Sequence, residues 1–263
     1  MERSITDQTR DKNKRLSFLE KAMLHYQRFI GHTLIIFTYF FIWAWMYFFL
    51  GYRFPKLKDL RKEFAQIKGS SSQPFLICAN HLTMIDSFII TWALGSNLSF
   101  FYDYKSFPWN LPDKKNFTSN LASRFLCFIG KCLPITRKGP VEETQKVFAK
   151  VYYLLGLGDT FMVFPEGTRS RSGRIEPGSG TYGVGKIIQK MPDTRVLCFY
   201  LRGAQQNKFS FFPKKNEVFA GAMKEIKPTT EKKGLRGMKE LSEQIMQELQ
   251  LMEQEYFDKI NSI

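Results

Sequence analysis

The spacing of apolar residues divides the chain into a helical N-terminal part and a longer part in which short apolar runs alternate with helical segments. Near the start, apolar residues recur every three or four positions, which is the period of one helix face. These residues are Leu16, Leu19, Met23, Tyr26 and Ile30. Basic residues lie between them, and this pattern predicts an amphipathic helix on a membrane surface. An ordinary helix that faces a protein core has the same spacing.

A run without charged residues follows, from Leu34 to Leu50, and it is unusually aromatic. With Gly51 and Tyr52 it approaches the length that crosses a bilayer. Lysines and arginines flank the run on both sides, so positive charge does not orient it. We therefore expect residues 1–52 to form a two-helix membrane-binding motif that dips into one leaflet. A single crossing that leads into a cytosolic domain is the alternative.

Residues 53–72 are expected to form a linker, and residues 73–263 a single domain. Apolar runs rich in β-branched and aromatic residues predict strands at 74–79, 98–104, 132–136, 160–165, 194–202 and 217–223. Helical patterns lie at 84–95, 117–130, 141–157, 181–190 and 236–257. This alternation predicts an α/β fold, with a central sheet, mostly parallel or mixed, that is flanked by helices.

Charge and composition narrow the range of molecules that the protein is expected to bind. The net charge of +15 favours an anionic partner: a membrane surface, a nucleotide-bearing or acidic carrier, a phosphorylated substrate or nucleic acid. Nucleic acid leaves the apolar run unexplained, so we expect none. The four cysteines lie in apolar surroundings without CxxC spacing, which predicts reduced thiols in the cytosol. No histidine is grouped with cysteines at the spacing of metal ligands, so we expect no zinc site.

The first candidate for chemistry is the segment NHLTMID at 80–86, which follows an apolar strand and leads into a predicted helix. Open α/β sheets place their ligands where strands end in this way. Five steps of a regular helix rotate by about 140°, so His81 and Asp86 can meet only if His81 lies in the turn before the helix. Asp86 would then fix the tautomer of the imidazole, and the other ring nitrogen could take a proton. A substrate hydroxyl can supply the nucleophile. A hydrolase with an internal serine nucleophile is another alternative, but the sequence has no G-x-S-x-G elbow.

A second candidate, FPEGTRS at 164–170, ends another apolar strand. Glu166 lies close to Arg169, and Arg171 and Arg174 follow. A guanidinium fork suits a phosphate group. An ordinary turn at a strand end, with solvated arginines, fits the same residues.

Together, these two motifs resemble those of the glycerolipid acyltransferase family typified by 1-acyl-sn-glycerol-3-phosphate acyltransferases. The resemblance covers roughly residues 74–225. It implies that His81 and Asp86 are the catalytic pair. It also implies an acceptor-binding set made of Glu166, Gly167, Arg169, Arg137 and Lys105. Arg137 ends the segment GKCLPITR, whereas Lys105 in YKSF can equally be an exposed loop lysine.

Two segments depart from the family pattern. Residues 196–201 lack the usual proline, and EPGSGTYG at 176–183 replaces the usual Lys-Gly step after the second motif. The reaction class is unaffected, but the identity of the acceptor is left open because the altered loop follows the acceptor-binding block.

The resemblance implies an O-acyltransferase of phospholipid biosynthesis. It would move a fatty acyl group from acyl-CoA or acyl carrier protein to the free hydroxyl of 1-acyl-sn-glycerol 3-phosphate and make phosphatidic acid. We expect no metal and no cofactor beyond this co-substrate, and a location on the cytoplasmic face of the inner membrane. Another lysophospholipid or hydroxyl-bearing lipid is an alternative acceptor. A non-catalytic membrane adaptor that binds anionic lipids is an alternative of another class, and the presence of His81 and Asp86 argues against it.

Overall fold

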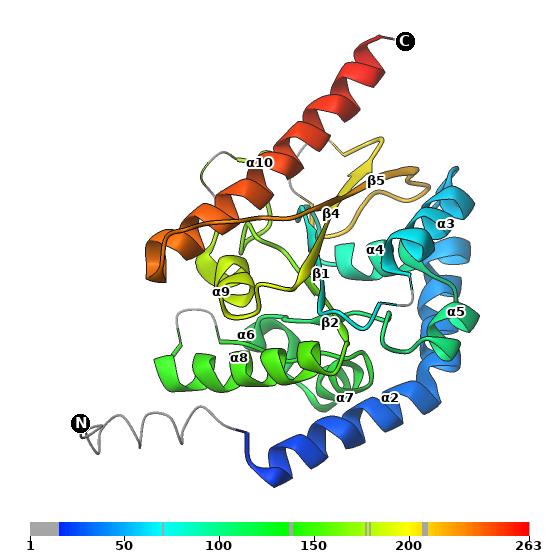
Figure 1. Cartoon of the computed structure of the whole chain (residues 1–263). Coiled ribbons are helices and arrows are strands. Elements are labelled where there is room, and N and C mark those ends of the chain that lie inside the picture. The colour runs from blue at the N-terminus through cyan, green and yellow to red at the C-terminus, as the bar shows by residue number, and fades with distance from the viewer. Residues whose placement is uncertain are drawn as a thin grey trace, which may run out of the picture.

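The computed structural model describes residues 16–69, 71–136, 139–176, 178, 180–206 and 210–262. Its centre is a five-stranded sheet in the order β2-β3-β1-β4-β5 (Figure 1). The strands are β1 (Phe75–Ala79), β2 (Trp109–Asn110), β3 (Thr160–Val163), β4 (Arg195–Gly203) and β5 (Phe219–Ile226). The first four run parallel, and β5 pairs antiparallel with β4. The predicted α/β class, with a mostly parallel sheet, is confirmed.

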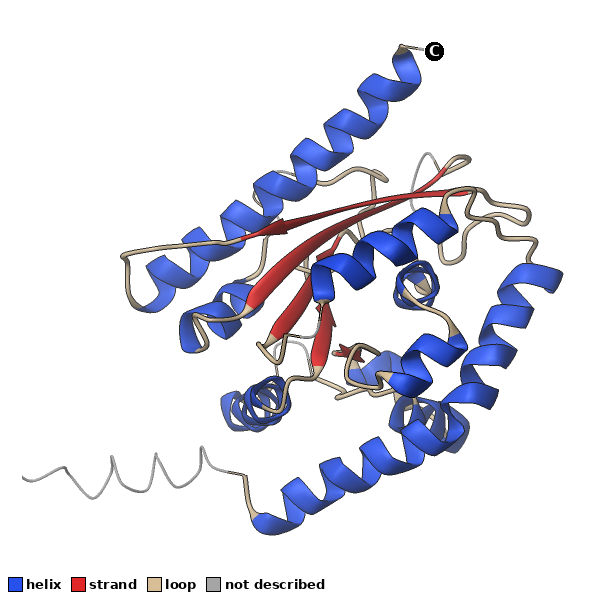
Figure 2. Ribbon diagram, turned by 45° about the vertical axis from the view of Figure 1, so that its right-hand side comes forward, coloured by secondary structure: helices blue, strands red, loops and turns tan. Residues whose placement is uncertain are grey.

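Helices cover both faces of the sheet (Figure 2). They are α2 (Phe18–Ala44) with its π-helical end η1 (Trp45–Phe49), α3 (Leu57–Lys68), α4 (Asp86–Leu94), α5 (Asn97–Tyr102), α6 (Lys114–Phe117), α7 (Leu121–Ile129), α8 (Val141–Gly156), α9 (Tyr182–Lys190) and α10 (Gly234–Asn261). One core joins α2, α3 and α4 to one face, and a second joins α8, α9 and α10 to the other. Because both faces are covered, β1 is buried at every position and reads as a continuous apolar run.

Three of the predicted elements need correction. The expected strand at 98–104 is instead helix α5 up to Tyr102, followed by a turn, because Ser96 and Ser99 make a capping box that starts a helix. The expected strand at 132–136 contributes only isolated bridges, and Pro134 within it has no N–H for a continuous ladder. The expected helix at 117–130 is confirmed as α7 but begins later, at Leu121, because Asn120 caps it. Strand β2 was missed because two residues show no periodicity.

The N-terminal element also differs from its prediction. The amphipathic and apolar segments, expected as two helices, form one helix from Phe18 to Phe49, which is long and apolar enough to cross a membrane. Gly31 is a contact point and not a break: a Cβ there would lie 2.9 Å from the Ile129 carbonyl oxygen. Helix α3 lies within the segment 53–72 that we expected as a linker. Residues 1–15 of the predicted membrane motif lie outside the described residues.

A buried ion pair network ties α2 to the domain. The Lys131 Nζ is fully buried and donates to the carbonyl oxygens of Tyr104 (2.7 Å) and Phe107 (2.9 Å) and to Asp159 (3.2 Å). Arg28 of α2 reaches the other carboxylate oxygen of Asp159 at 3.3 Å. Removing one partner of a buried pair leaves an uncompensated charge, so this network fixes α2 against the domain.

Candidate active site

His81 and Asp86 meet at the carboxyl end of β1. His81 lies in the turn between β1 and α4, and Asp86 is the first residue of α4. Nδ1 of His81 lies 3.0 Å from Oδ2 of Asp86. This is the geometry that the spacing of the first motif required. The ring's other nitrogen, Nε2, has no hydrogen-bond partner within the described part of the chain, and His81 lines a pocket.

The Asp86 carboxylate is held on all sides. It is only 2% exposed, and its Oδ2 accepts hydrogen bonds from the backbone N–H groups of Leu82 (2.6 Å) and Thr83 (2.7 Å). The Thr83 hydroxyl donates to Oδ1. The carboxylate also lies at the positive end of the α4 dipole. These contacts fix its orientation, so it can hold His81 in one tautomer.

The His81 ring is fixed from another side by Phe164. The two rings are stacked, with centroids 4.1 Å apart and planes 19° from parallel. The preceding residue, Asn80, exchanges two hydrogen bonds with the backbone of Leu201 in β4, at 2.9 and 2.8 Å. The turn that carries His81 is thus tied to both neighbouring strands of the sheet.

Residues of the second motif form hydrogen bonds with the backbone of His81. Glu166 Oε1 accepts from the His81 N–H at 2.8 Å, and the Ser170 N–H donates to the His81 carbonyl at 2.8 Å. Burial raises the pKa of Glu166 to about 7; the Asp86 carboxylate acts in the same direction, whereas the His81 N–H acts against it. The structure therefore places Glu166 against the backbone of His81, where it orients the turn.

Gly167 and Arg169 occupy different parts of the same loop. Gly167 has φ +69°, and a Cβ there would lie 2.3 Å from the methyl group of Thr181, so the turn requires glycine. Thr181 closes the loop by donating its N–H and its hydroxyl to the Pro165 carbonyl, at 2.8 and 3.0 Å. Arg169 lines the pocket, with its guanidinium 4.8 Å from the centroid of the Phe211 ring.

The pocket joins a base and a cation to an apolar wall. Its volume is about 710 Å³, within the range of small-molecule sites. His81 and Arg169 line it, and apolar side chains from several elements complete it: Leu111, Pro112, Ile135, Phe148, Val184 and Ile187. An alkyl chain fits this wall, while a phosphate or carboxylate suits Arg169.

Of the predicted site residues, Lys105 is not brought to this pocket. The Lys105 carbonyl accepts from the N–H of Thr160 (2.9 Å), the first residue of β3, whereas His81 lies beyond the other end of the parallel strands. The Lys105 side chain is exposed. Arg137 lies outside the described residues. The described residues contain no group of three or more His, Cys, Asp or Glu side chains that could hold a metal ion.

Sequence reasoning also missed residues that shape the site. Thr83 lies within the first motif, and its position three residues before Asp86 was an available signal, since threonine often donates near the start of a helix. Thr181 and Phe211 come from distant segments and had no local signal.

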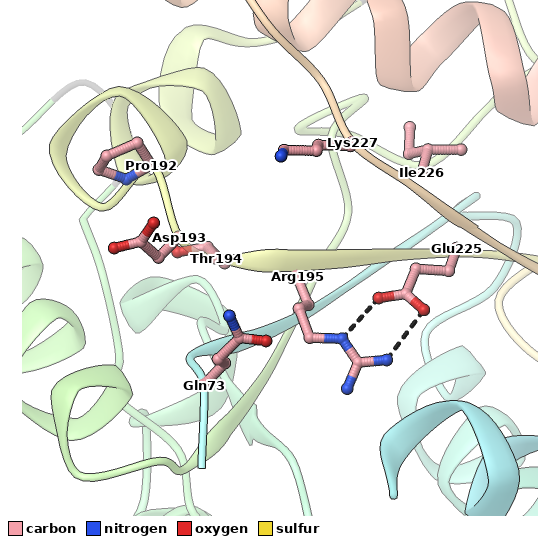
Figure 3. Close-up of a pocket in the computed structure, with 8 residues that line it drawn as sticks. All are labelled: Gln73, Pro192, Asp193, Thr194, Arg195, Glu225, Ile226 and Lys227. Atoms are coloured by element: carbon pink, nitrogen blue, oxygen red, sulfur yellow. Dashed lines mark hydrogen bonds and ion pairs between the residues drawn. The ribbon is translucent and has the colours of Figure 1, made fainter. Parts of the chain in front are cut away.

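A second pocket, of about 390 Å³, lies at the amino end of the sheet (Figure 3). Its lining includes Arg195 and Glu225, which form two hydrogen bonds of 2.6 and 2.9 Å. Arg195 also donates to the Lys68 and Ile67 carbonyl oxygens. This pocket contains no histidine.

The comparison with known families agrees with this geometry. Residues 56–204, more than half of the chain, match the model of the Acyltransferase family. The matched stretch contains both motifs and the four parallel strands. A search of curated proteins found no match. With this match over more than half of its length, the chain belongs to the Acyltransferase family, which glycerolipid acyltransferases typify.

Proposed function

We propose that the protein transfers a fatty acyl group from acyl-CoA or acyl carrier protein to the free hydroxyl of 1-acyl-sn-glycerol 3-phosphate, which yields phosphatidic acid. The observation that carries the proposal is the His81–Asp86 pair. Its members are 3.0 Å apart, and the pair lies on a pocket that combines Arg169 with an apolar wall.

The chain's own residues can account for the proton transfers. Nε2 of His81 takes the proton from the acceptor hydroxyl as the oxygen attacks the thioester carbonyl. The tetrahedral intermediate collapses to an ester when the C–S bond breaks, and His81 returns the proton to the departing thiolate. Asp86 keeps the imidazole oriented and stabilises its charged form between these steps. The reaction needs no cofactor beyond the thioester.

The pocket supports a lipid acceptor with a phosphate. Arg169 supplies a positive charge beside His81, and the apolar wall suits an acyl chain. Another lysophospholipid is the second candidate, because the segment 176–183 after the second motif departs from the family pattern. A different headgroup could require a different loop there.

The N-terminal helix supports association with one leaflet of a membrane. Its buried side chains run from Leu24 to Met46, so one face packs along the domain for most of its length. A perpendicular crossing would draw the domain into the bilayer, whereas a helix lying in the plane of the membrane would not. We propose this arrangement on the cytoplasmic face of the inner membrane.

Purified protein in mixed micelles would test the function. The donors would be labelled palmitoyl-CoA and acyl carrier protein that carries a labelled palmitoyl group. The acceptors would be the lyso forms of phosphatidic acid, phosphatidylglycerol and phosphatidylethanolamine, and His81→Ala would serve as the control. We expect transfer to lysophosphatidic acid by the wild type alone. Transfer only to another acceptor would support the second candidate. Absence of transfer to every acceptor, with vesicle binding intact, would support the non-catalytic adaptor.

A further inference from the structure

The exposed apolar side chains of the protein gather on one group of helices. Most of the large ones within the described residues lie on α2, η1, α5 and α7. On α2 and η1 they are Phe18, Leu19, Met23, Tyr26, Phe29, Phe37, Phe40, Phe41, Trp45, Phe48 and Phe49. Contiguous exposed apolar surface of this kind marks a contact with a protein partner or a membrane.

Helix α7 has its own apolar outer face. Leu121, Phe125 and Leu126 are 80%, 55% and 58% exposed, while Cys127 and Ile129 point inward and are buried. Residues four apart lie on the same side of a helix, so Leu121 and Phe125 form one apolar face. This face has no covering element within the described residues.

The C-terminal end of α7 packs against α2. The Gln27 side chain of α2 donates to the carbonyl oxygens of Phe128 (2.9 Å) and Cys132 (3.2 Å) at the end of α7. The rings of Tyr26 and Phe128 lie 6.1 Å apart. Because these contacts join the two helices side by side, a surface that receives α2 also meets α7.

Helix α7 also lies beside the candidate active site. Asn116 and Phe117 of the preceding helix α6 line the pocket that contains His81. Cys127 of α7 contacts the Phe117 carbonyl, with its sulfur 3.4 Å from the oxygen. The wall of the pocket thus continues directly into α7.

The segment of chain that carries α7 is basic. No Asp or Glu occurs between residues 114 and 141. Lys115 and Arg124 are exposed there. An apolar helix face with basic neighbours fits a bilayer that contains anionic lipids.

We propose that α7 is a second membrane-inserting helix, whose Leu121, Phe125 and Leu126 enter the same leaflet as the outer face of α2. Lys115 and Arg124 then meet lipid phosphates, and the pocket opens at the membrane surface. The occupant is a bilayer because α7, with its exposed apolar side chains, packs beside a 32-residue helix that has the length and hydropathy of a membrane segment. The further consequence, that an acceptor lipid passes from the leaflet past α6 to His81, rests on the proposed function.

A fluorescent probe on α7 tests the insertion directly. Phe125→Cys in the full chain would be labelled with an environment-sensitive dye and mixed with phosphatidylcholine vesicles, with and without phosphatidylglycerol, that contain spin-labelled lipids. The matched control is Leu235→Cys, since Leu235 is 70% exposed. It belongs to α10, a helix that lies on the other side of the molecule from α2 (Figure 1). Wild-type protein taken through the same labelling gives the background from its four cysteines.

We expect the probe at position 125 to be quenched by the lipid spin labels, more strongly with phosphatidylglycerol, and the probe at 235 to stay in water. A probe at 125 that stays in water while one at Phe37→Cys is quenched would overturn the proposal. Energy transfer between labelled copies without lipid quenching would identify a second copy of the chain as the occupant, and would also overturn it.

An activity measurement separates this proposal from the proposed function. In the variant with Leu121, Phe125 and Leu126 all changed to Ser, transfer to an acceptor in detergent should be unchanged. Transfer to the same acceptor in vesicles should fall roughly tenfold or more, because membrane binding scales with buried apolar area. An unchanged rate in vesicles would contradict the proposal. Failure of wild-type transfer in detergent would reject the proposed function and leave the quenching result standing.

Discussion

Both ends of the parallel sheet carry charged side chains that are hydrogen-bonded, but the hydrogen bonds lead to different places. At the amino end, Arg195 is bonded to Glu225 and to backbone carbonyls, so its charge is balanced within the protein (Figure 3). At the carboxyl end, Asp86 and Glu166 are hydrogen-bonded too, but their contacts converge on His81. Nε2 of that residue has no partner among the described residues, and the residue lines a pocket.

This difference separates a stabilising network from a candidate reactive one. Both networks satisfy their charges by hydrogen bonds, although the Arg195–Glu225 pair is partly exposed while Asp86 and Glu166 are buried. What distinguishes them is whether the chain of hydrogen bonds ends within the protein or at an atom that a substrate can reach. Substitutions at the carboxyl end should therefore change kinetics, and those at the amino end should change stability.

The largest expected effect is at the His81–Asp86 pair. His81→Ala should lower kcat on the order of 10²–10⁴-fold, the usual contribution of a positioned base. Asp86→Asn should cost a comparable factor because the amide can hold the wrong tautomer. Acyl transfer by each purified variant would be measured beside a melting curve. A folded His81→Ala enzyme with near-normal turnover would remove the basis of the comparison.

The next effect concerns Arg169 and the acceptor. A hydrogen bond to a charged group contributes roughly 1.5–3 kcal/mol, so Arg169→Ala should raise the KM for the acceptor about 10- to 100-fold with a smaller change in kcat. Arg169→Lys should restore only part of this, because lysine lacks the bidentate fork. The measurement is acceptor kinetics at saturating donor. Wild-type KM in both variants would show that the phosphate binds elsewhere.

Glu166 should give a pH-dependent effect on stability. Burial raises the pKa of its folded-state carboxyl from 4.5 to about 7. Between these values the folded state binds a proton that the unfolded state has lost, so this group makes the wild type less stable as pH rises through that window. Glu166→Gln cannot titrate and can still accept from the His81 N–H. Its melting temperature should rise relative to wild type from pH 5 to pH 7.5, and parallel melting curves over this range would contradict the assignment.

Local patterns in the sequence were sufficient to predict that His81 and Asp86 meet, and to predict most of the strands. The first motif is seven residues long, and its geometry depends only on a strand, a turn and the start of a helix. The helix α5 was mistaken for a strand because its apolar residues dominate a short segment, while the signal that decides it is the capping box at Ser96.

Long-range relations could not be predicted in this way. Glu166 contacts a backbone N–H that is 85 positions away in sequence, so its positioning role follows only from the pairing of β1 with β3. Lys105 resembled a binding residue by its neighbours, but the register of β3 decides which end of the sheet it occupies. The chemistry of each side chain could be read from the sequence, whereas the end of the sheet at which that side chain lies could not.

A small effect on acceptor kinetics is expected at Lys105. It lies at the amino end, near Thr160, so Lys105→Ala should leave the acceptor KM within about twofold of wild type, since single exposed charges contribute little. The assay is the one used for Arg169. A KM increase as large as that of Arg169→Ala would show that the acceptor reaches this end of the sheet.

The smallest kinetic effect is expected at Arg195. Its pair with Glu225 is partly exposed, with side chains 21% and 35% accessible, and such pairs typically contribute about 0.2–1 kcal/mol. Arg195→Ala should lower the free energy of unfolding by this amount or somewhat more, because the Lys68 and Ile67 carbonyls also lose a donor. Glu225→Gln removes the charge but keeps those carbonyl contacts, so a double-mutant cycle separates the two contributions.

Both variants should keep wild-type kcat and KM, since the residues that hold His81 lie at the opposite end of the strands. A kinetic defect without a loss of stability would mean that the amino end is part of the active machinery, and the distinction between the two ends would fail.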